Sequence, residues 1–433
     1  MQTVKLFKRT AALFAALTVA AAAAAITAFA DDALPGNGTE ADPYIIRTGA
    51  ELVEIGGSEG GVGYITLAND IDLSAYAGQQ TCIIKKLTGK LDGAGHKITG
   101  LNLKGKAGKY GSEVKTGLIG ELSGSVENLT ISNAVITGAN SSNYVGTLAA
   151  YIPVGSEVYI NNCAVTGTIA GPTSYTSNLY IGALVGYAKY VSGSETTVSF
   201  NNCISDVDNT CSGALNSGGV MGLIEDYVAL NVSCCAVLGN VAAYSSACGI
   251  LGIYKGGNAA LNISNSYFGG KLSGKSKCGI AYNQYNKPKI QCSKFYFDTQ
   301  KNTYTKALSN DDVDGASGVT TAGIMALAST LDGFEASDEF GGYPVPKQQT
   351  AAAFSVTVDG NDVKVTAAKA GSYSLVLASY SGEALADVHI QTVTFANDGD
   401  GQTVSVPDGF TADGRSFKAM LWNGMRPLAK SNN

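Results

Sequence analysis

The sequence predicts an all-β protein: a right-handed parallel β-helix followed by a small antiparallel β-sandwich. Three observations support this fold class. Glycine supplies 54 of the 433 residues, a glycine-anchored segment recurs along most of the chain, and strands of a different spacing follow residue 353. Charged residues make up only 15% of the chain and hydrophobic residues 45%, a composition typical of a folded protein with many turns and few exposed helices. We expect a repeat body over residues 31–346, a linker over 347–352 and the sandwich over 353–433.

A glycine followed by small and apolar residues recurs roughly every 29–37 residues, within the 20–50-residue period of solenoid repeats. The anchors are Gly117-Leu118-Ile119-Gly120, Gly146-Thr147-Leu148-Ala149, Gly182-Ala183-Leu184-Val185-Gly186, Gly219-Val220-Met221-Gly222, Gly249-Ile250-Leu251-Gly252 and Gly279-Ile280-Ala281. Behind each anchor comes a stretch that alternates apolar with polar residues, as in 158–165 and 198–204, which is the period of a half-buried strand.

A third short stretch closes each unit, so we expect three strands per turn of the β-helix. One turn cannot bury its inner face alone, and stacked turns build the continuous core. The alternative is a β-propeller, whose four-stranded blades of about 40–45 residues are longer than these units.

The C-terminal part follows a different pattern. Alternating stretches about 8–15 residues apart have the spacing of a β-sandwich. The expected strands are 354–358, 363–366, 373–380, 388–395, 403–406 and 417–422.

The first thirty residues have the pattern of a cleaved signal peptide. Lys5, Lys8 and Arg9 precede an apolar run over 11–25, and a small-x-small cleavage site ends at Ala30. The run is short for a membrane span of about 20 residues. We therefore expect a secreted or extracellular protein that is not inserted in a membrane after cleavage. Because the chain ends without an apolar tail, it is expected to be released or held non-covalently at the cell surface.

Charge excludes some classes of partner. Of the 29 basic residues, three lie in the signal peptide, which leaves 26 against 35 acidic residues, a net charge of −9. A basic patch that could follow a phosphate backbone is missing, so nucleic acid is excluded as a partner and anionic membranes are disfavoured.

The anchors resemble the GLUG motif of bacterial secreted and cell-surface proteins. The resemblance extends upstream to 36–46, 67–73 and 91–101, and Gly342-Tyr343-Pro344 is similar to the closing segment. It implies a β-helical architecture over roughly residues 36–346 and says little about activity, because a fold does not imply a function. Residues 418–428 resemble the end of small sandwich modules found at the termini of bacterial surface proteins.

Candidate catalytic groups are few. The chain has two histidines, His96 and His389, and neither a His-Glu-x-x-His nor a Cys-x-x-Cys motif. Asp206 and Asp208 are two residues apart in a strand-like stretch and would share a face. Paired carboxylates can act as acid and base on a polysaccharide when their environments separate their pKa values. The alternative is a solvated turn, since no later unit repeats the pair.

We expect no cofactor other than calcium. Asn310, Asp312 and Asp314 begin a segment with the N-x-D-x-D-G pattern of a calcium loop, although the twelfth position is Thr321 instead of Glu. A second oxygen-rich turn covers 397–401. The alternative for both segments is an ordinary loop, because Asp and Gly are common loop residues.

Nine cysteines in an exported chain raise the question of disulfides. Cys163, Cys203 and Cys235 occupy one repeat position and should stack in a column, with Ala134 and Ser266 as the equivalents on neighbouring turns. Small buried thiols that fill the core are the main interpretation.

Cys248 and Cys278 form a second column, directly before the anchor glycine. Adjacent turns lie about 4.8 Å apart, which is compatible with the Cα separation of a disulfide. This pair is the best disulfide candidate.

Tyrosine is abundant, with 22 residues. Those in the turn-like parts of the repeats could present a platform for sugar rings or a protein surface, since tyrosine offers apolar area with a polar tip. The candidates are Tyr144, Tyr151, Tyr187, Tyr190 and Tyr227. The alternative is that tyrosines cap the strand ends over the core.

The sequence thus predicts an exported adhesion or binding protein that presents its β-helix to glycans or surface proteins. Two alternatives stay open: a polysaccharide-acting lyase or hydrolase that uses Asp206 and Asp208, and a purely structural spacer.

Overall fold

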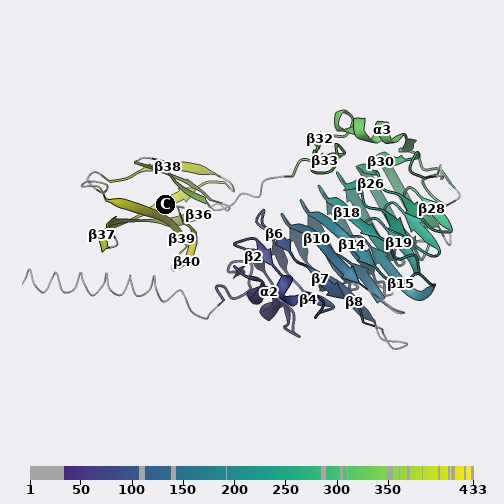
Figure 1. Ribbon diagram of the computed structural model, residues 1–433, viewed down its shortest axis with the longest axis horizontal. Helices are drawn as coiled ribbons and strands as arrows, with labels where there is room; N and C mark the ends of the chain where they lie inside the picture. Colours follow the sequence, from purple (N-terminus) through teal and green to yellow (C-terminus); the bar gives the residue numbers. More distant parts are fainter. Residues whose placement is uncertain are drawn as a thin grey trace, which may run out of the picture. The chain divides into compact units, whose positions relative to one another are not determined.

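The computed structural model describes residues 34–433 apart from 107–112, 138–142, 192, 284–288, 303–305, 310, 349–354, 360, 368–370, 383, 398–399, 408–409, 411–414, 424–425 and 431–433. The signal peptide and its cleavage site at Ala30 lie outside the described residues, as do Asn310 and most of the linker. The predicted fold class is confirmed: stacked parallel strands form a β-helix, and antiparallel sheets follow it in the sequence (Figure 1).

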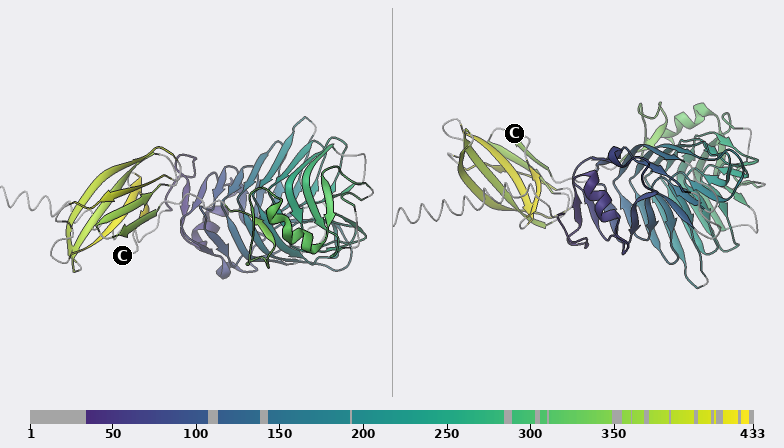
Figure 2. Two further views of the ribbon diagram at one scale, coloured as in Figure 1. Left: turned by 90° about the horizontal axis from the view of Figure 1, so that it is seen from above. Right: turned by 60° about the horizontal axis from the view of Figure 1, so that its bottom comes forward.

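Each turn of the β-helix contains four short strands instead of the three expected. In most turns the anchor segment is divided between two strands, because one strand ends at the anchor glycine or at the residue before it and the chain turns sharply before the next strand begins. Equivalent strands of successive turns pair in parallel and build four ladders, which Figure 2 shows from two further sides.

The first and second ladders are joined by β8 (Val114–Leu122), which pairs with strands of both. The first ladder continues through β11 (Asn143–Gly146), β15 (Thr176–Gly182), β19 (Ala214–Gly218), β24 (Ser246–Cys248) and β28 (Ser276–Cys278). The second contains β4 (Cys82–Leu87), β12 (Ala149–Ile152), β16 (Val185–Ala188), β20 (Met221–Ile224), β25 (Leu251–Tyr254) and β29 (Ala281–Asn283).

The third and fourth ladders form one large sheet. The third contains β1 (Tyr44–Ile46), β2 (Ile65–Leu67), β5 (Lys90–Asp92), β9 (Ser125–Glu127), β13 (Glu157–Asn161), β17 (Thr196–Asn201), β21 (Val228–Ser233), β26 (Ala260–Phe268) and β30 (Lys289–Asp298). The fourth contains β3 (Ile71–Asp72), β6 (Lys97–Thr99), β7 (Asn102–Lys104), β10 (Thr130–Thr137), β14 (Ala164–Ala170), β18 (Ile204–Asn209), β22 (Ala236–Val237), β23 (Val241–Ala242), β27 (Leu272–Ser273) and β31 (Ala316–Val319), together with the second halves of β26 and β30.

Glycine lies at the corner between the first and second ladders on the earlier turns. A Cβ atom on Gly146 would lie 2.2 Å from the carbonyl oxygen of Ala149, and one on Gly222 would lie 2.5 Å from that of Gly186. At these two positions the backbones of neighbouring strands approach too closely for a side chain, whereas Cys248 takes the position of Gly146 on a later turn. This contact explains why the repeat is marked by glycine.

The corner between the third and fourth ladders carries a column of residues with positive φ. Asn128, Asn162, Asn202 and Asn265 have φ between 46° and 55°, a region that asparagine tolerates better than most residues. The Nδ2 atom of Asn162 donates to Oδ1 of Asn128 (2.9 Å) and that of Asn202 to Oδ1 of Asn162 (3.0 Å). Cys234 occupies the next turn, with φ 51°. We call this column the asparagine stack.

A short helix, α2 (Gly49–Gly56), lies near the N-terminal end of the stacked turns (Figure 1). It was not expected, although its start has a clear signal. Thr48 and Glu51 form a capping box, in which each side chain bonds the backbone N–H of the other residue. The buried Leu52 attaches the helix to the core. A 3₁₀ turn, η1 (Ser74–Tyr76), follows β3.

The last part of the repeat body folds back over the outer face of the fourth ladder. This C-terminal cap, residues 321–348, contains α3 (Thr321–Met325), η2 (Ala326–Ser329) and the antiparallel pair β32 (Phe334–Ala336) and β33 (Pro344–Pro346). Its buried apolar residues, among them Leu327 and Phe334, pack on an outward column that includes Ile204 and Tyr267. The cap therefore covers apolar surface that the fourth ladder would otherwise expose.

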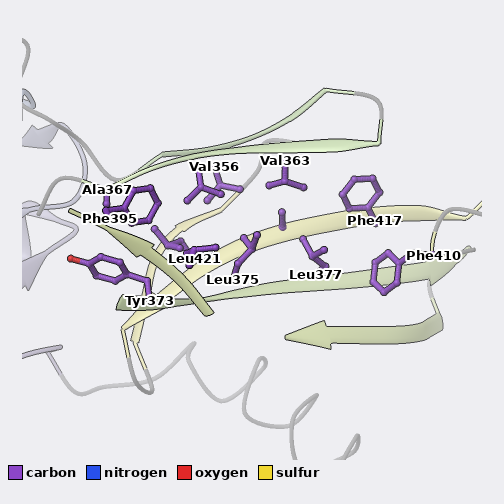
Figure 3. Close-up of a cluster of buried hydrophobic side chains, with 13 residues drawn as sticks. Val356, Val363, Ala367, Tyr373, Leu375, Leu377, Phe395, Phe410, Phe417 and Leu421 are labelled. Carbon is purple, nitrogen blue, oxygen red and sulfur yellow. The ribbon is translucent and has the colours of Figure 1, made fainter. Parts of the chain in front are cut away.

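The C-terminal sheets enclose a core of their own, as predicted for a sandwich. One sheet contains β34 (Ser355–Asp359), β35 (Asp362–Thr366) and β38 (Gly401–Ser405). The other contains β37 (Ala384–Phe395), β36 (Gly371–Ser381), β39 (Ser416–Asn423) and β40 (Arg426–Lys430). Figure 3 shows Val363 of the first sheet above Leu375, Leu377 and Leu421 of the second, all completely buried. The six expected strands are present, and β40 was missed.

Candidate binding surface

The tyrosines of the first and second ladders form one cluster. The ring centroid of Tyr144 lies 4.3 Å from that of Tyr187, 6.0 Å from that of Tyr151 and 6.4 Å from that of Tyr180. Tyr151, Tyr180 and Tyr187 are almost fully buried, with at most 7% of each residue exposed. We call these four residues the tyrosine cluster. It is a second apolar core beside the glycine corner.

Strand register produces the cluster. Tyr144 and Tyr180 are direct neighbours in the first ladder, and Tyr151 and Tyr187 in the second. In the sequence, Tyr144 and Tyr180 each stand two residues before the anchor glycine, while Tyr151 and Tyr187 stand five residues after it. This spacing was the signal that could have predicted the cluster and that could have added Tyr180 to the predicted residues.

Charged groups surround the cluster and satisfy its hydroxyl groups. The hydroxyl of Tyr144 donates to Glu113 (3.2 Å), and Lys255 Nζ donates to the hydroxyl of Tyr180 (3.0 Å). Burial raises the pKa of Tyr151 to about 12 and raises the pKa values of Tyr144 and Tyr187 further. These phenols therefore stay protonated at neutral pH.

Tyr190 and Tyr227 form a separate pair at the corner between the second and third ladders, in which Tyr227 is exposed and Tyr190 is partly buried. Their ring centroids are 4.9 Å apart and their planes differ by 22°. Tyr227 is 42% exposed and has φ 52°. Glu225 ties the pair to the tyrosine cluster, because its carboxylate accepts the backbone N–H of Tyr190 (3.0 Å) and hydrogen-bonds to Tyr187.

All five predicted tyrosines thus lie in one region, in two different roles. Tyr151 and Tyr187 are buried and Tyr144 is partly buried, so these three cannot offer a flat exposed platform. They support the structure, which was the alternative interpretation. Of the five, Tyr227 alone is exposed, and its ring stacks on the partly buried Tyr190.

A second exposed tyrosine pair has a different geometry. Tyr175 and Tyr244 are 4.9 Å apart, but their planes are tilted by 51°. Lys275 Nζ lies 3.9 Å from the ring centroid of Tyr244. An ammonium group thus already covers part of this pair, and no flat face is presented.

Asp206 and Asp208 share the outer face of β18, as expected, but have unequal surroundings. Burial, and secondly the charge of Asp208, raise the pKa of the Asp206 carboxyl. Asp208 accepts hydrogen bonds from the backbone N–H and the side-chain amide of Asn240, both at 2.8 Å. Neither carboxylate is among the lining residues of the two grooves described below, and the enzymatic alternative stays a prediction.

Calcium binding at Asn310, Asp312 and Asp314 stays a prediction. Asp312 and Asp314 line an open groove of about 470 Å³ together with Asp311. Within the described residues, no group of three His, Cys, Asp or Glu side chains is placed to hold a metal ion. The third predicted ligand, Asn310, lies outside the described residues.

The cysteine columns correspond to register neighbours. Cys163, Cys203 and Cys235 are buried thiols on successive turns. Ser266 is their equivalent on the next turn, as expected, because its hydroxyl accepts the backbone N–H of Cys235 (2.9 Å). The preceding equivalent is Leu129 instead of Ala134, since Thr130 pairs with Ala164.

Cys248 and Cys278 are direct partners in the first ladder, yet both are free thiols in the structure. In a parallel pair the two Cα–Cβ bonds point the same way, so the Cβ atoms stay about 4.8 Å apart. A disulfide needs a Cβ separation of about 3.5–4.5 Å. The in-register placement that suggested the bridge therefore works against it.

Within the described residues, none of the helices is long and apolar enough to cross a bilayer. No protein-family model matches the chain.

Among curated proteins, the chain is similar to halomucin of Haloquadratum walsbyi (strain DSM 16790 / HBSQ001), with 34% identity over 166 residues. This match covers 35% of the chain and 2% of halomucin. Among solved structures, a "putative immunoglobulin A1 protease" from Bacteroides ovatus is similar with 17% identity and a TM-score of 0.46, covering 72% of this chain and 95% of that one. A likeness at this level carries no argument about activity, and these matches assign the chain to no family.

Proposed function

We propose that the chain is an extracellular binding protein whose β-helix holds a sugar ring on the Tyr190–Tyr227 pair. The single observation that carries this proposal is the exposed ring of Tyr227, which has a strained backbone and stacks on the partly buried Tyr190. Among the ten non-glycine residues with positive φ in the described chain, Tyr227 is the only aromatic one. Such a conformation costs about 1–3 kcal/mol and persists where the surroundings impose it, commonly at ligand sites.

The surroundings of the pair fit this role. The carboxylate of Glu225 accepts a hydrogen bond from the backbone N–H of Tyr190 and holds it in place. Asp226, between Glu225 and Tyr227, accepts the backbone N–H of Asn258 on the next turn (2.7 Å). The aromatic faces are therefore fixed before a ligand arrives, which lowers the entropy cost of binding. The predicted signal peptide and the partial likeness to halomucin support an extracellular location.

The test is a glycan-array screen of the mature chain, followed by titration of a bound sugar with the Tyr227→Ala variant. We expect at least a tenfold weaker affinity, about 1.4 kcal/mol. Tyr175→Ala is the matched control, because Tyr175 is 52% exposed and also pairs with a tyrosine. Equal affinity of Tyr227→Ala and the parent chain would reject the proposal.

A further inference from the structure

The outer face of the third ladder is uncharged over three consecutive turns. Its inward positions are filled by buried residues such as Val198 and Phe200. Its outward positions on β17, β21 and β26 are Thr197, Ser199, Asn201, Ala229, Asn231, Ser233, Ala260, Asn262 and Ser264. No other surface feature described above combines hydroxyl and amide groups without a charge.

A groove of about 410 Å³ lies on this face, across β21, β26 and β30. Asn231, Asn262 and Gln291 form one column of its lining, and Ser233 and Ser264 belong to the next. The serines are short, which explains why the surface is hollow here.

The amide groups of the groove are held in place by each other. Nδ2 of Asn262 donates to Oδ1 of Asn231 (2.7 Å), and Nδ2 of Asn231 donates to Oγ of Ser199 (3.0 Å). A primary amide has two N–H donors and two acceptor lone pairs. Each asparagine therefore retains hydrogen-bonding capacity for a ligand in addition to its bond within the column.

The C-terminal cap borders the groove. Asn265, next to Ser264 in the chain, exchanges two hydrogen bonds with the backbone of Asp332, at 2.8 and 2.9 Å. Lys294 forms an ion pair with the Asp332 carboxylate (2.7 Å). The charges of Lys294 and Asp332 compensate each other, so this edge contributes little net electrostatic potential to the groove.

An aromatic ring lies on the same face. Tyr159 of β13 occupies the same column as Ser199, Asn231 and Asn262 and is 48% exposed. Its hydroxyl donates to the exposed carboxylate of Glu157, so the uncharged surface ends at this turn. Tyr159 is two turns from Asn231, about 10 Å at the spacing of β-strands. An aromatic face and a row of amides and hydroxyls thus follow one line across the turns.

From this arrangement we infer that the outer face of the third ladder, from Tyr159 to Gln291, binds an uncharged glycan chain that lies across the turns. The groove lining carries no charge that could compensate an anionic or cationic polymer. The exposed Glu157 and Lys289 lie on the outward face only at the two ends of the site. A peptide strand could not add to this ladder, because the backbone groups of β21 and β26 are used in pairing with their neighbours. The site is separate from the Tyr190–Tyr227 pair and does not require it.

Affinity gel electrophoresis of the full mature chain tests this inference. The probes are neutral polymers (dextran, mannan and xyloglucan), anionic alginate and cationic chitosan. We expect at least one neutral polymer to retard the protein, and neither alginate nor chitosan to do so through this face.

Two variants change the groove in different ways: Asn262→Asp adds a charge and Ser264→Gln fills the hollow. Each is expected to weaken the binding of the neutral polymer at least tenfold, while Thr66→Gln, on the same face three turns before Tyr159, leaves it unchanged. Tyr227→Ala should retain groove-dependent binding, which separates this site from the proposed tyrosine platform. Thermal unfolding shows whether each variant is folded. The affinity of one folded groove variant, Asn262→Asp or Ser264→Gln, is sufficient to test the inference.

Three results would overturn the inference. They are the absence of binding to all three neutral polymers, binding restricted to alginate or chitosan, and unchanged affinity in a folded Asn262→Asp or Ser264→Gln variant.

Discussion

At the residue scale, the asparagine stack shows how one substitution interrupts a repeated interaction. Cys234 sits where the other turns place asparagine, and Asn265 donates its amide to the Cys234 sulfur at 3.2 Å. A thiol is only a weak acceptor and a weak donor, whereas an amide at this position could accept from Asn265 and also donate a full-strength hydrogen bond to Asn202. The stack is therefore discontinuous at this turn.

We expect Cys234→Asn to increase the free energy of unfolding by about 1–2 kcal/mol, the value of one or two hydrogen bonds, because asparagine also tolerates positive φ. The gain is limited by the lost contact between the Cys234 side chain and the cap. Urea denaturation followed by circular dichroism measures it. Asn162→Cys is the reverse change and should cost a similar amount, whereas equal stability of Cys234→Asn and the parent chain would contradict the role of the stack.

Asp206 provides a pH-dependent prediction. Its pKa is raised in the folded chain, chiefly by burial. The ionised carboxylate therefore disfavours the folded state at neutral pH, and this penalty disappears as the pH falls through the folded-state pKa. We expect Asp206→Asn to raise the free energy of unfolding at pH 7 and to flatten its pH dependence down to about pH 4, where the unfolded carboxyl titrates.

Urea denaturation at pH 7, 5 and 4 checks this. Asp208→Asn is the control with the opposite sign, because it weakens the charge-assisted bonds from Asn240. A lower stability of Asp206→Asn at pH 7 would show that the carboxylate has a favourable partner.

Single residues were also the hardest level to predict. The stacked asparagines are visible in the sequence: Asn128, Asn162 and Asn202 each stand two residues before a strand of the fourth ladder, and Asn265 lies within β26. Asparagine is, however, equally common in ordinary turns. The five predicted tyrosines were chosen for their turn-like context. Context does not distinguish the buried Tyr151 from the exposed Tyr227, since that depends on which neighbouring turn covers each ring.

At the scale of the elements, the glycine corner is the feature on which the first and second ladders depend. A Cβ atom on Gly222 would meet the backbone of Gly186 at 2.5 Å and that of Ile181 at 2.8 Å. Backbone atoms cannot move aside as a flexible side chain can. We expect Gly222→Ala to destabilise the β-helix by about 1–3 kcal/mol or more.

Thermal unfolding compared with Gly60→Ala tests this expectation. A Cβ on Gly60 has no heavy atom nearer than 3.9 Å, so that variant should be nearly neutral. If the two variants were equally stable, the close approach at the corner would not be needed.

The elements could be predicted where the repeat enforces them. Glycine anchors and alternating stretches identified the parallel ladders, but the division of each anchor between two strands was missed, because the sharp turn occupies only two residues. The helix α2 and strand β40 were also missed. Both are single elements without a second copy in the sequence to reveal them.

At the scale of the whole molecule, the C-terminal sandwich should fold by itself. Its core is built only from residues between Val356 and Leu421. We expect a fragment of residues 353–433 to unfold in one cooperative thermal transition by circular dichroism. Leu377→Ala, at a completely buried position, should lower its stability by about 2–5 kcal/mol. A fragment without a cooperative transition would show that this core needs the rest of the chain.

The cap has a consequence for how the β-helix opens. Turns of a solenoid contact only their neighbours, so unfolding can begin at one end and proceed turn by turn. Here the cap reaches from Asn202, whose amide donates to the carbonyl of Lys347, to Lys294, which pairs with Asp332. The turns between them cannot fray independently while the cap is attached. Backbone amides of β18, β22 and β26 should therefore exchange their hydrogens through a single opening event. Turns that would otherwise open one by one then unfold as one cooperative unit because the cap joins them.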